Sequence, residues 1–140
     1  MNRTIGILTG GGDVPGLNSV IKSVVYRADE FGGRVIGIRK GWEGLTHMDP
    51  AQEIDPEYVR ILTRENTRHI DRTGGTILHT SRTNPANMKG KALPHFMGKE
   101  ELDGLQVQED LWDFTPVALR NLERLDLDIL IALGGDDTLS

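Results

Sequence analysis

The chain has 140 residues, no cysteine and a formal net charge of −5, and it is 37% hydrophobic and 26% charged. These proportions are ordinary for one globular domain. The missing cysteines exclude disulfides and thiolate metal sites, and the acidic balance argues against nucleic-acid binding, which requires a basic face. No apolar run is long enough for a signal peptide or a membrane-spanning helix, so we expect a cytoplasmic protein with no membrane partner.

The first forty residues carry the pattern of a strand–helix–strand unit. Residues 5–8 form a short apolar run that is typical of a buried parallel strand. Residues 17–31 carry apolar side chains at helical spacing, and we expect the whole stripe in the core. The glycine pair at 32–33 ends this helix, and residues 34–39 then predict a second strand.

The remaining elements are less regular until the carboxyl end. Asp55-Pro56 predicts the start of a short helix that runs through Leu62, and residues 74–79 predict a short strand. Residues 83 to about 113 show no clear periodicity, so we expect a surface excursion with one small helix. Thr115-Pro116 predicts the N-cap and first residue of another helix, and the apolar run 129–133 predicts a central parallel strand.

Strands that alternate with helices predict an α/β fold, a three-layer, doubly wound and mostly parallel sheet of the Rossmann-like type. Glycine-rich segments follow two of the strands, at residues 9–16 and from Gly134 onward. In such folds ligands bind beyond the carboxyl ends of the strands, near a topological switch point. Glycines let backbone N–H groups approach a phosphate, and a helix N-terminus favours an anion. The two segments together therefore predict a phosphate site, although three glycines alone are more often a tight turn.

Neither segment matches a common nucleotide-binding motif. A Walker-type loop closes with Gly-Lys-Ser/Thr, whereas Gly16 is followed by Leu17-Asn18. A dinucleotide-binding fold needs an acidic residue at the end of its second strand, where this chain has Arg39-Lys40. Both interpretations fail on these residues.

Four segments in order instead resemble the phosphofructokinase family: residues 5–18 (IGILTGGGDVPGLN), 41–45 (GWEGL), Gly74-Gly75-Thr76 with Ser81-Arg82, and 133–138 (LGGDDT). The excursion after residue 83 is longer than in the compact bacterial members. The resemblance implies the amino-terminal part of the phosphofructokinase fold, with residues 1–140 as a donor-phosphate-binding domain. The family's catalytic base lies in a Thr-Ile-Asp-Asn-Asp segment, which is missing here, as are the sugar-binding residues. We therefore expect a longer protein, and no turnover by these residues alone.

The resemblance also implies site residues. Arg82 would contact the donor and transferring phosphates and neutralise charge that develops in the transition state. Asp136 would hold Mg²⁺, which commonly takes one or two carboxylates and completes its shell with phosphate oxygens and water. The other contacts to the donor phosphates would come from Gly11, Gly12, Gly135 and Thr138.

Asp137 is the position that bears on the donor. ATP-dependent relatives usually carry glycine there, which leaves room for the α-phosphate of the nucleotide. A carboxylate adds bulk and like charge, and two unit charges about 4 Å apart repel by roughly 4 kcal/mol at an effective dielectric constant of about 20. Inorganic diphosphate has no third phosphate to repel. We therefore hypothesise that Asp137 belongs to the catalytic site of a diphosphate-dependent enzyme.

The leading hypothesis is transfer of a phosphoryl group from diphosphate to the 1-hydroxyl of fructose 6-phosphate, a glycolytic reaction that gives fructose 1,6-bisphosphate. An ATP-dependent 6-phosphofructokinase and a non-catalytic phosphate- or nucleotide-binding module stay open as alternatives. Family members assemble as dimers or tetramers, so we expect a homo-oligomer. The histidines have no metal-like spacing and are expected to be structural or exposed: His47, His69, His79 and His95. Trp42 would either line the donor pocket or pack in the core.

Overall fold

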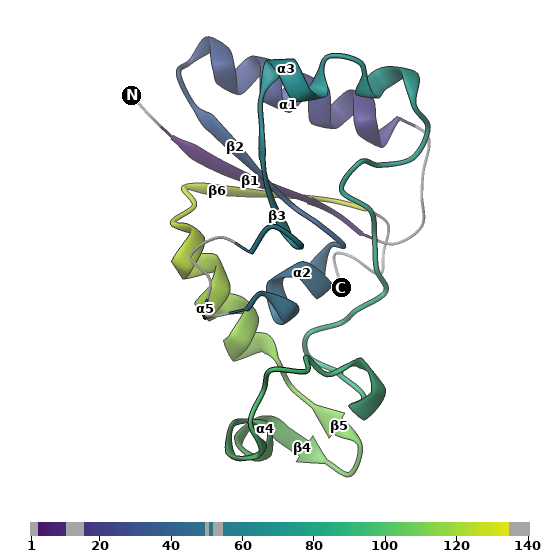
Figure 1. Ribbon diagram of the computed structural model, residues 1–140, viewed down its shortest axis with the longest axis vertical. Helices are drawn as coiled ribbons and strands as arrows, with labels where there is room; N and C mark the ends of the chain where they lie inside the picture. The colour runs from purple at the N-terminus through teal and green to yellow at the C-terminus, as the bar shows by residue number, and fades with distance from the viewer. Residues whose placement is uncertain (1–2, 11–15, 50, 52–54, 135–140) are drawn as a thin grey trace.

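The computed structural model describes residues 3–10, 16–49, 51 and 55–134. Its main sheet has the strand order β3-β2-β1-β6 (Figure 1). Strand β1 is parallel to both of its neighbours, and β3 pairs antiparallel with β2. The strand bounds are Thr4–Thr9 for β1, Arg34–Ile38 for β2, Val59–Leu62 for β3 and Ile129–Leu133 for β6. The predicted mostly parallel, doubly wound sheet is confirmed.

Helices cover both faces of this sheet (Figure 1). One face carries α1 (Leu17–Glu30), α3 (Arg64–Thr67) and the 3₁₀ turn η1 (Ile70–Arg72). The other carries α2 (Trp42–His47) and α5 (Thr115–Leu125). Because side chains alternate along a strand, Ile7 of β1 joins the core on the α1 side, whereas Leu8 joins the core on the α2 and α5 side.

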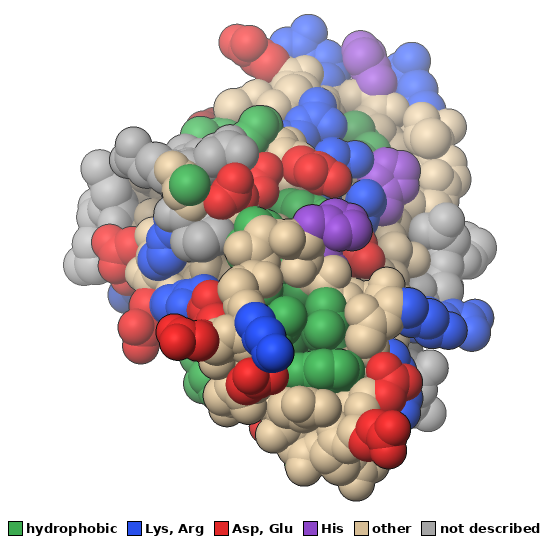
Figure 2. Space-filling model, turned by 60° about the horizontal axis from the view of Figure 1, so that its bottom comes forward, with side chains coloured by type: hydrophobic (Ala, Val, Ile, Leu, Met, Phe, Trp, Pro, Cys, Tyr) green, Lys and Arg blue, Asp and Glu red, His purple; other side chains and the backbone are tan. Residues whose placement is uncertain are grey.

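The segment between residues 83 and 113 forms the predicted excursion. It contains the 3₁₀ turn η2 (Gly90–Ala92), the helix α4 (Lys99–Leu105) and a hairpin of β4 (Gln106–Gln108) with β5 (Leu111–Trp112). The one small helix was predicted and the hairpin was not. The excursion shares a third, separate core with the start of α5, made of Met88, Met97, Phe114 and Val117. On the face shown in Figure 2, acidic and basic side chains are interspersed around a small apolar area.

The helix predicted from Asp55 to Leu62 is wrong. Pro56 begins a turn, and the chain then enters β3, where Val59 and Leu62 are buried against the core. The Asp55 carboxylate fixes this turn, because it accepts hydrogen bonds from the backbone N–H groups of Asp49 and Glu57 at 3.0 Å each. Pairing with the free edge of β2 satisfies the backbone groups of residues 59–62, and this outweighs the local helical signal of Pro56.

The strand predicted at residues 74–79 is also wrong, because this segment turns across the carboxyl ends of the strands and bonds to side chains from other elements. Strand β6 was predicted to be central, but in the described part of the chain it lies at an edge of the sheet. Two residues of the α1 stripe, Val20 and Phe31, are 42% and 64% exposed rather than in the core. Within the described ranges, no helix is both long and apolar enough to cross a bilayer.

Candidate phosphate-donor site

The two glycine-rich segments begin side by side. Strands β1 and β6 are parallel neighbours with Thr9 opposite Leu133, and the backbone N–H of Gly10 donates to the carbonyl of Leu133 at 2.8 Å. The chain passes from β1 to β2 on one side and reaches β6 on the other side of β1. This is a topological switch point, the place where open α/β sheets bind ligands. Gly10 and Gly134 therefore both leave the sheet at the predicted position.

Helix α1 directs its N-terminus toward the same edge (Figure 1). Its N-cap is Gly16, with φ of 94°, and no side chain caps it. No acidic residue lies in its first turn. The N–H groups of a first helical turn lack partners within the helix and carry a partial positive charge. An anion at this end of α1 would meet these groups, and no carboxylate of the first helical turn would compete with it.

Most of the predicted site residues lie outside the described part of the chain: Gly11, Gly12, Gly135, Asp136, Asp137 and Thr138. Their roles stay predictions. Among the described residues no three His, Asp or Glu side chains lie together in a way that could hold a metal ion. The predicted Mg²⁺ donor set is one carboxylate, completed by phosphate oxygens and water. That set fits the usual chemistry of the ion, and Gly134, the last residue that the structure describes, is exposed.

Arg82 is described, and the structure brings its segment to the same edge. Ser81, one residue before it, donates its hydroxyl to the carbonyl of Lys40 at 2.7 Å, just beyond the end of β2. The carbonyl of His79 accepts the hydroxyl of Thr9, the last residue of β1, at 3.0 Å. The Arg82 side chain is exposed and has no ion pair within the described ranges. An exposed guanidinium is chemically suited to bind a phosphate anion.

The segment 41–45 has a clear structural function. Gly41 has φ of 56°, and a Cβ atom there would lie 2.8 Å from the carbonyl oxygen of Thr9. A Cβ on Gly44 would meet the carbonyl of Arg39. These two glycines allow α2 to pack directly on the ends of the strands. Trp42 is half-buried and packs on the core cluster of that face, which supports its packing interpretation.

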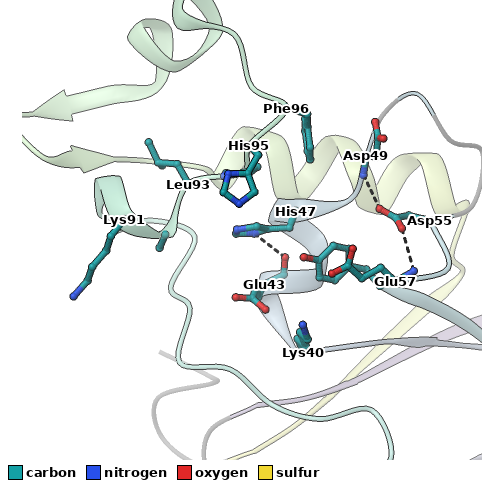
Figure 3. A pocket seen from close by; sticks show the side chains of 13 residues that line it. Lys40, Glu43, His47, Asp49, Asp55, Glu57, Lys91, Leu93, His95 and Phe96 are labelled. Carbon is teal, nitrogen blue, oxygen red and sulfur yellow. Dashed lines mark hydrogen bonds between the residues drawn. The ribbon is translucent and has the colours of Figure 1, made fainter.

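A polar cavity of about 450 Å³ lies beside this segment, between α2, the turn at residues 55–58 and residues 91–96 of the excursion (Figure 3). No single motif predicted it, because its lining comes from separate segments. Its lining residues are Lys40, Glu43, His47, Asp49, Asp55, Glu57, Tyr58, Lys91, Ala92, Leu93, Pro94, His95 and Phe96.

The ionisable groups of this cavity constrain one another. The Nδ1 atom of His47 lies 3.1 Å from the carbonyl oxygen of Glu43 (Figure 3), which leaves Nε2 for the cavity. Burial, together with the negative charges of Glu57, Glu43 and Asp55, raises the pKa of Tyr58 to about 12. Tyr58 is thus a neutral hydrogen-bond donor throughout the physiological pH range.

A doubly wound sheet with two glycine-rich segments meeting at its switch point is the architecture of phosphate- and nucleotide-binding α/β proteins. A sequence model described as Phosphofructokinase matches residues 4–140. The chain belongs to the phosphofructokinase family, and the resemblance drawn from its four segments is confirmed.

Relatives with different donors are similar to the chain. It is 41% identical over 135 residues to a Dictyoglomus thermophilum protein named pyrophosphate–fructose 6-phosphate 1-phosphotransferase, covering 96% of this chain and 30% of that one. It is 39% identical over 137 residues to ATP-dependent 6-phosphofructokinase 3 of Streptomyces coelicolor, with the same coverage. The solved phosphofructokinase of Saccharomyces cerevisiae superposes with a TM-score of 0.67 at 27% identity, covering 98% of this chain and 14% of that one. The chain thus spans about 30% of the length of these curated relatives.

Proposed function

We propose that the complete protein transfers a phosphoryl group to the 1-hydroxyl of fructose 6-phosphate and that the residues described above supply the donor side of its site. The observation that carries this proposal is the hydrogen bond from Gly10 to Leu133, the last residue of β6, because both glycine-rich segments therefore leave the sheet side by side at its switch point. Family membership supports the reaction class, because the similar proteins are named as phosphotransferases or phosphofructokinases.

In this reaction the chain would bind and orient the donor rather than form a covalent intermediate. The glycine segments would surround the donor phosphates with backbone N–H groups, and Arg82 would neutralise charge on the transferring group. Asp136 would hold Mg²⁺, which, when bound, neutralises charge on the phosphates. Accurate placement of donor and acceptor supplies much of the rate enhancement in such a site.

Diphosphate is the donor that we favour. Asp137 stands where ATP-dependent members of the family usually carry glycine, and by that resemblance its carboxylate would face the α-phosphate of a nucleotide. A repulsion of about 4 kcal/mol corresponds to a preference of roughly two to three orders of magnitude at ~1.4 kcal/mol per factor of ten. Diphosphate would avoid this repulsion because it ends after its second phosphate.

The test compares Asp137→Gly with the complete wild-type protein, using diphosphate and ATP as alternative donors. We expect wild type to favour diphosphate and the variant to gain at least about tenfold in the ratio of kcat/KM for ATP over diphosphate. Asp137→Asn is the matched variant, because it removes the charge and keeps the bulk. An unchanged ratio in Asp137→Gly would exclude the donor assignment, and a wild-type protein inactive with both donors would exclude the reaction.

A further inference from the structure

Three polar side chains are buried where the Arg82 segment crosses the ends of the strands. Thr9, Asn18 and Thr76 are 0%, 2% and 7% exposed. Burial of a hydroxyl or amide group is unfavourable unless its hydrogen bonds are satisfied, so such groups constrain the geometry around them. Thr76 belongs to the segment 73–79, which leads into Arg82, and Thr9 and Asn18 both form hydrogen bonds to that segment.

The two threonines form a directed chain of hydrogen bonds. The Thr9 hydroxyl donates to the carbonyl of His79 at 3.0 Å, which uses its single hydrogen. The Thr76 hydroxyl, 2.9 Å from that of Thr9, must therefore donate to it. The Thr76 oxygen in turn accepts the backbone N–H of Leu78 at 3.1 Å. Both hydroxyl hydrogens are used, and the end of β1 is joined to the turn at residues 76–79.

Asn18 makes a second connection, from the first turn of α1. Its Nδ2 donates to the carbonyl of Thr73 at 2.9 Å, and its Oδ1 accepts the backbone N–H of Ile77 at 2.7 Å. Both ends of the amide therefore bond to the same segment. A charged or shortened side chain could not supply this donor and acceptor together.

These bonds hold a backbone that is otherwise unfavourable. His79 and Lys40 both have φ of 60°, an uncommon conformation for residues other than glycine. The N–H of Lys40 donates to the carbonyl of Leu78 at 2.7 Å, and its carbonyl accepts the hydroxyl of Ser81 at 2.7 Å. Such residues persist where the surroundings determine their conformation, and they cluster at functional sites. Here Lys40 directly precedes Gly41, and His79 lies three residues before Arg82.

We infer that Thr9 and Asn18 are positioning residues that fix the Arg82 segment against the end of β1 and the start of α1 before a donor binds. The inference rests on the proposed function, since it assigns these residues to the placement of the guanidinium beside the donor phosphates. A charge held in place in advance stabilises a transition state without reorganisation during the reaction. Neither side chain needs to touch the donor.

The test uses Thr9→Val and Thr9→Ser in the complete protein. Valine keeps the size of threonine and removes the hydroxyl, whereas serine keeps the hydroxyl. We expect Thr9→Val to lower kcat about tenfold or more, the usual effect of a small misplacement, with no change in the KM for fructose 6-phosphate. Thr9→Ser should retain activity close to wild type.

Thr67→Val is the matched control. Thr67 is also 0% exposed, and its hydroxyl donates to the carbonyl of Thr63 at 2.6 Å, within α3 and its cap. The Thr67→Val variant also loses a buried threonine hydroxyl, but one that lies away from the strand ends. Its kcat should therefore stay at the wild-type value. An equal loss of kcat in Thr67→Val and Thr9→Val would overturn the inference.

A second measurement is independent of turnover. Hydrogen exchange at the amides of Leu78 and Lys40 should be faster in Thr9→Val than in Thr9→Ser, and calorimetry should show weaker binding of inorganic diphosphate. If wild type has no phosphotransferase activity, the proposed function fails while exchange and diphosphate binding still decide the inference. Identical exchange and binding in the two variants would overturn it. If Thr9→Val does not fold, Asn18→Asp replaces it, because aspartate loses the bond to the Thr73 carbonyl. Its kcat should also fall about tenfold or more, and an unchanged kcat would overturn the inference.

Discussion

At the scale of single residues, Asp113 connects the excursion to α5 through one carboxylate. Its Oδ1 accepts the backbone N–H of Thr115 at 2.9 Å, at the start of the helix. Hydrogen bonds from the Thr115 hydroxyl and from that N–H hold the pKa of Asp113 below its usual value of 3.8. The helix was predicted to have Thr115 as its N-cap and Pro116 as its first residue. It instead begins one residue earlier, at Thr115, with Phe114 at the N-cap position and Asp113 supplying the side-chain bond.

We predict that Asp113→Ala lowers the free energy of unfolding by about 1 kcal/mol at neutral pH, as for other helix-start side chains. Since the folded-state pKa is lowered, the charge-linked stabilisation is present above the unfolded-state pKa and is lost as the pH falls through the folded-state value. Urea unfolding of wild type and variant between neutral and acidic pH measures this. A difference that stays constant down to strongly acidic pH would contradict the prediction.

Tyr58 provides a second residue-scale prediction. Because its pKa is raised to about 12, its stabilising effect is complete below the unfolded-state pKa and is lost as the pH rises through the folded-state value. The tyrosinate absorbance of wild type minus that of Tyr58→Phe should therefore titrate well above pH 10 while the protein is folded. A midpoint for this difference near pH 10 would mean that Tyr58 is not held neutral by the cavity.

At the scale of elements, the packing of α2 on the strand ends depends on the lack of a side chain at Gly41. Gly41 has φ of 56°, a conformation that side chains disfavour. A Cβ atom at this position would also lie only 2.8 Å from the carbonyl oxygen of Thr9. Gly104 in α4 differs on both counts, since nothing lies within 4 Å of its Cβ position. Comparing the two positions therefore distinguishes a glycine that the structure requires from one that alanine could replace.

We predict that Gly41→Ala lowers the free energy of unfolding by about 1–3 kcal/mol, the range for a residue forced into a sparsely populated conformation. Gly104→Ala should leave stability unchanged or raise it by up to about 1 kcal/mol, because alanine favours a helix. Thermal and urea unfolding of the two variants give both values. Equal effects of the two substitutions would show that the contact with Thr9 does not constrain α2.

Sequence periodicity predicted β1, α1, β2, α5 and β6, but not β3, the short helices α2 and α3 or the hairpin of β4 and β5. The apolar runs that became β1 and β6 and the helical spacing that became α1 are local signals, and the elements formed where those signals lie. The segment 55–62 failed because an available strand edge at β2 decided its conformation. Residues 74–79 failed because Asn18 and Thr9 satisfy their backbone groups, and no local pattern encodes such distant partners.

The place of the candidate site in the fold was predictable, whereas the roles of its residues stay predictions. Glycines after two strands placed Gly10 and Gly134 at one edge of the sheet, which the hydrogen bond to Leu133 confirms. The cavity beside α2 and the polar connections of Thr9 and Asn18 were not predicted. They depend on how loops from separate elements meet, and that is decided by tertiary packing.

At the scale of the whole molecule, the buried apolar side chains of the described residues form three separate clusters. Two lie on opposite faces of the main sheet, and the third joins the excursion to the start of α5. Between the excursion and α2 lies a polar cavity, rather than a continuous apolar core. Its stability therefore depends mainly on the third cluster, around Met88 and Phe114.

We predict that the excursion opens locally without unfolding of the sheet. Amides of α4 and β4 should exchange hydrogen much faster than those of β1 and β2, whose strands are buried between two helical layers. Native-state hydrogen exchange of the complete protein measures this. Met97→Ala should increase exchange in residues 83–113 alone, and a matching increase in β1 would show that the clusters unfold as one unit.

The pairing of β1 with β6 also determines the order in which parts of the sheet can form while the chain is being synthesised. The N–H of Thr4 donates to the Asp128 carboxylate, a partner 124 residues away in the sequence. The N–H of Gly10 donates to the carbonyl of Leu133, which is also distant in the sequence. The first strand, α1 and β2 are near neighbours and can associate early, whereas contacts of such sequence separation form slowly. On the ribosome, the edge that carries both glycine segments would thus be completed only after Leu133 has been released. Nascent chains that still lack β6 would carry an unpaired strand edge on β1. At that stage a chaperone could bind this edge, or another chain could aggregate with it.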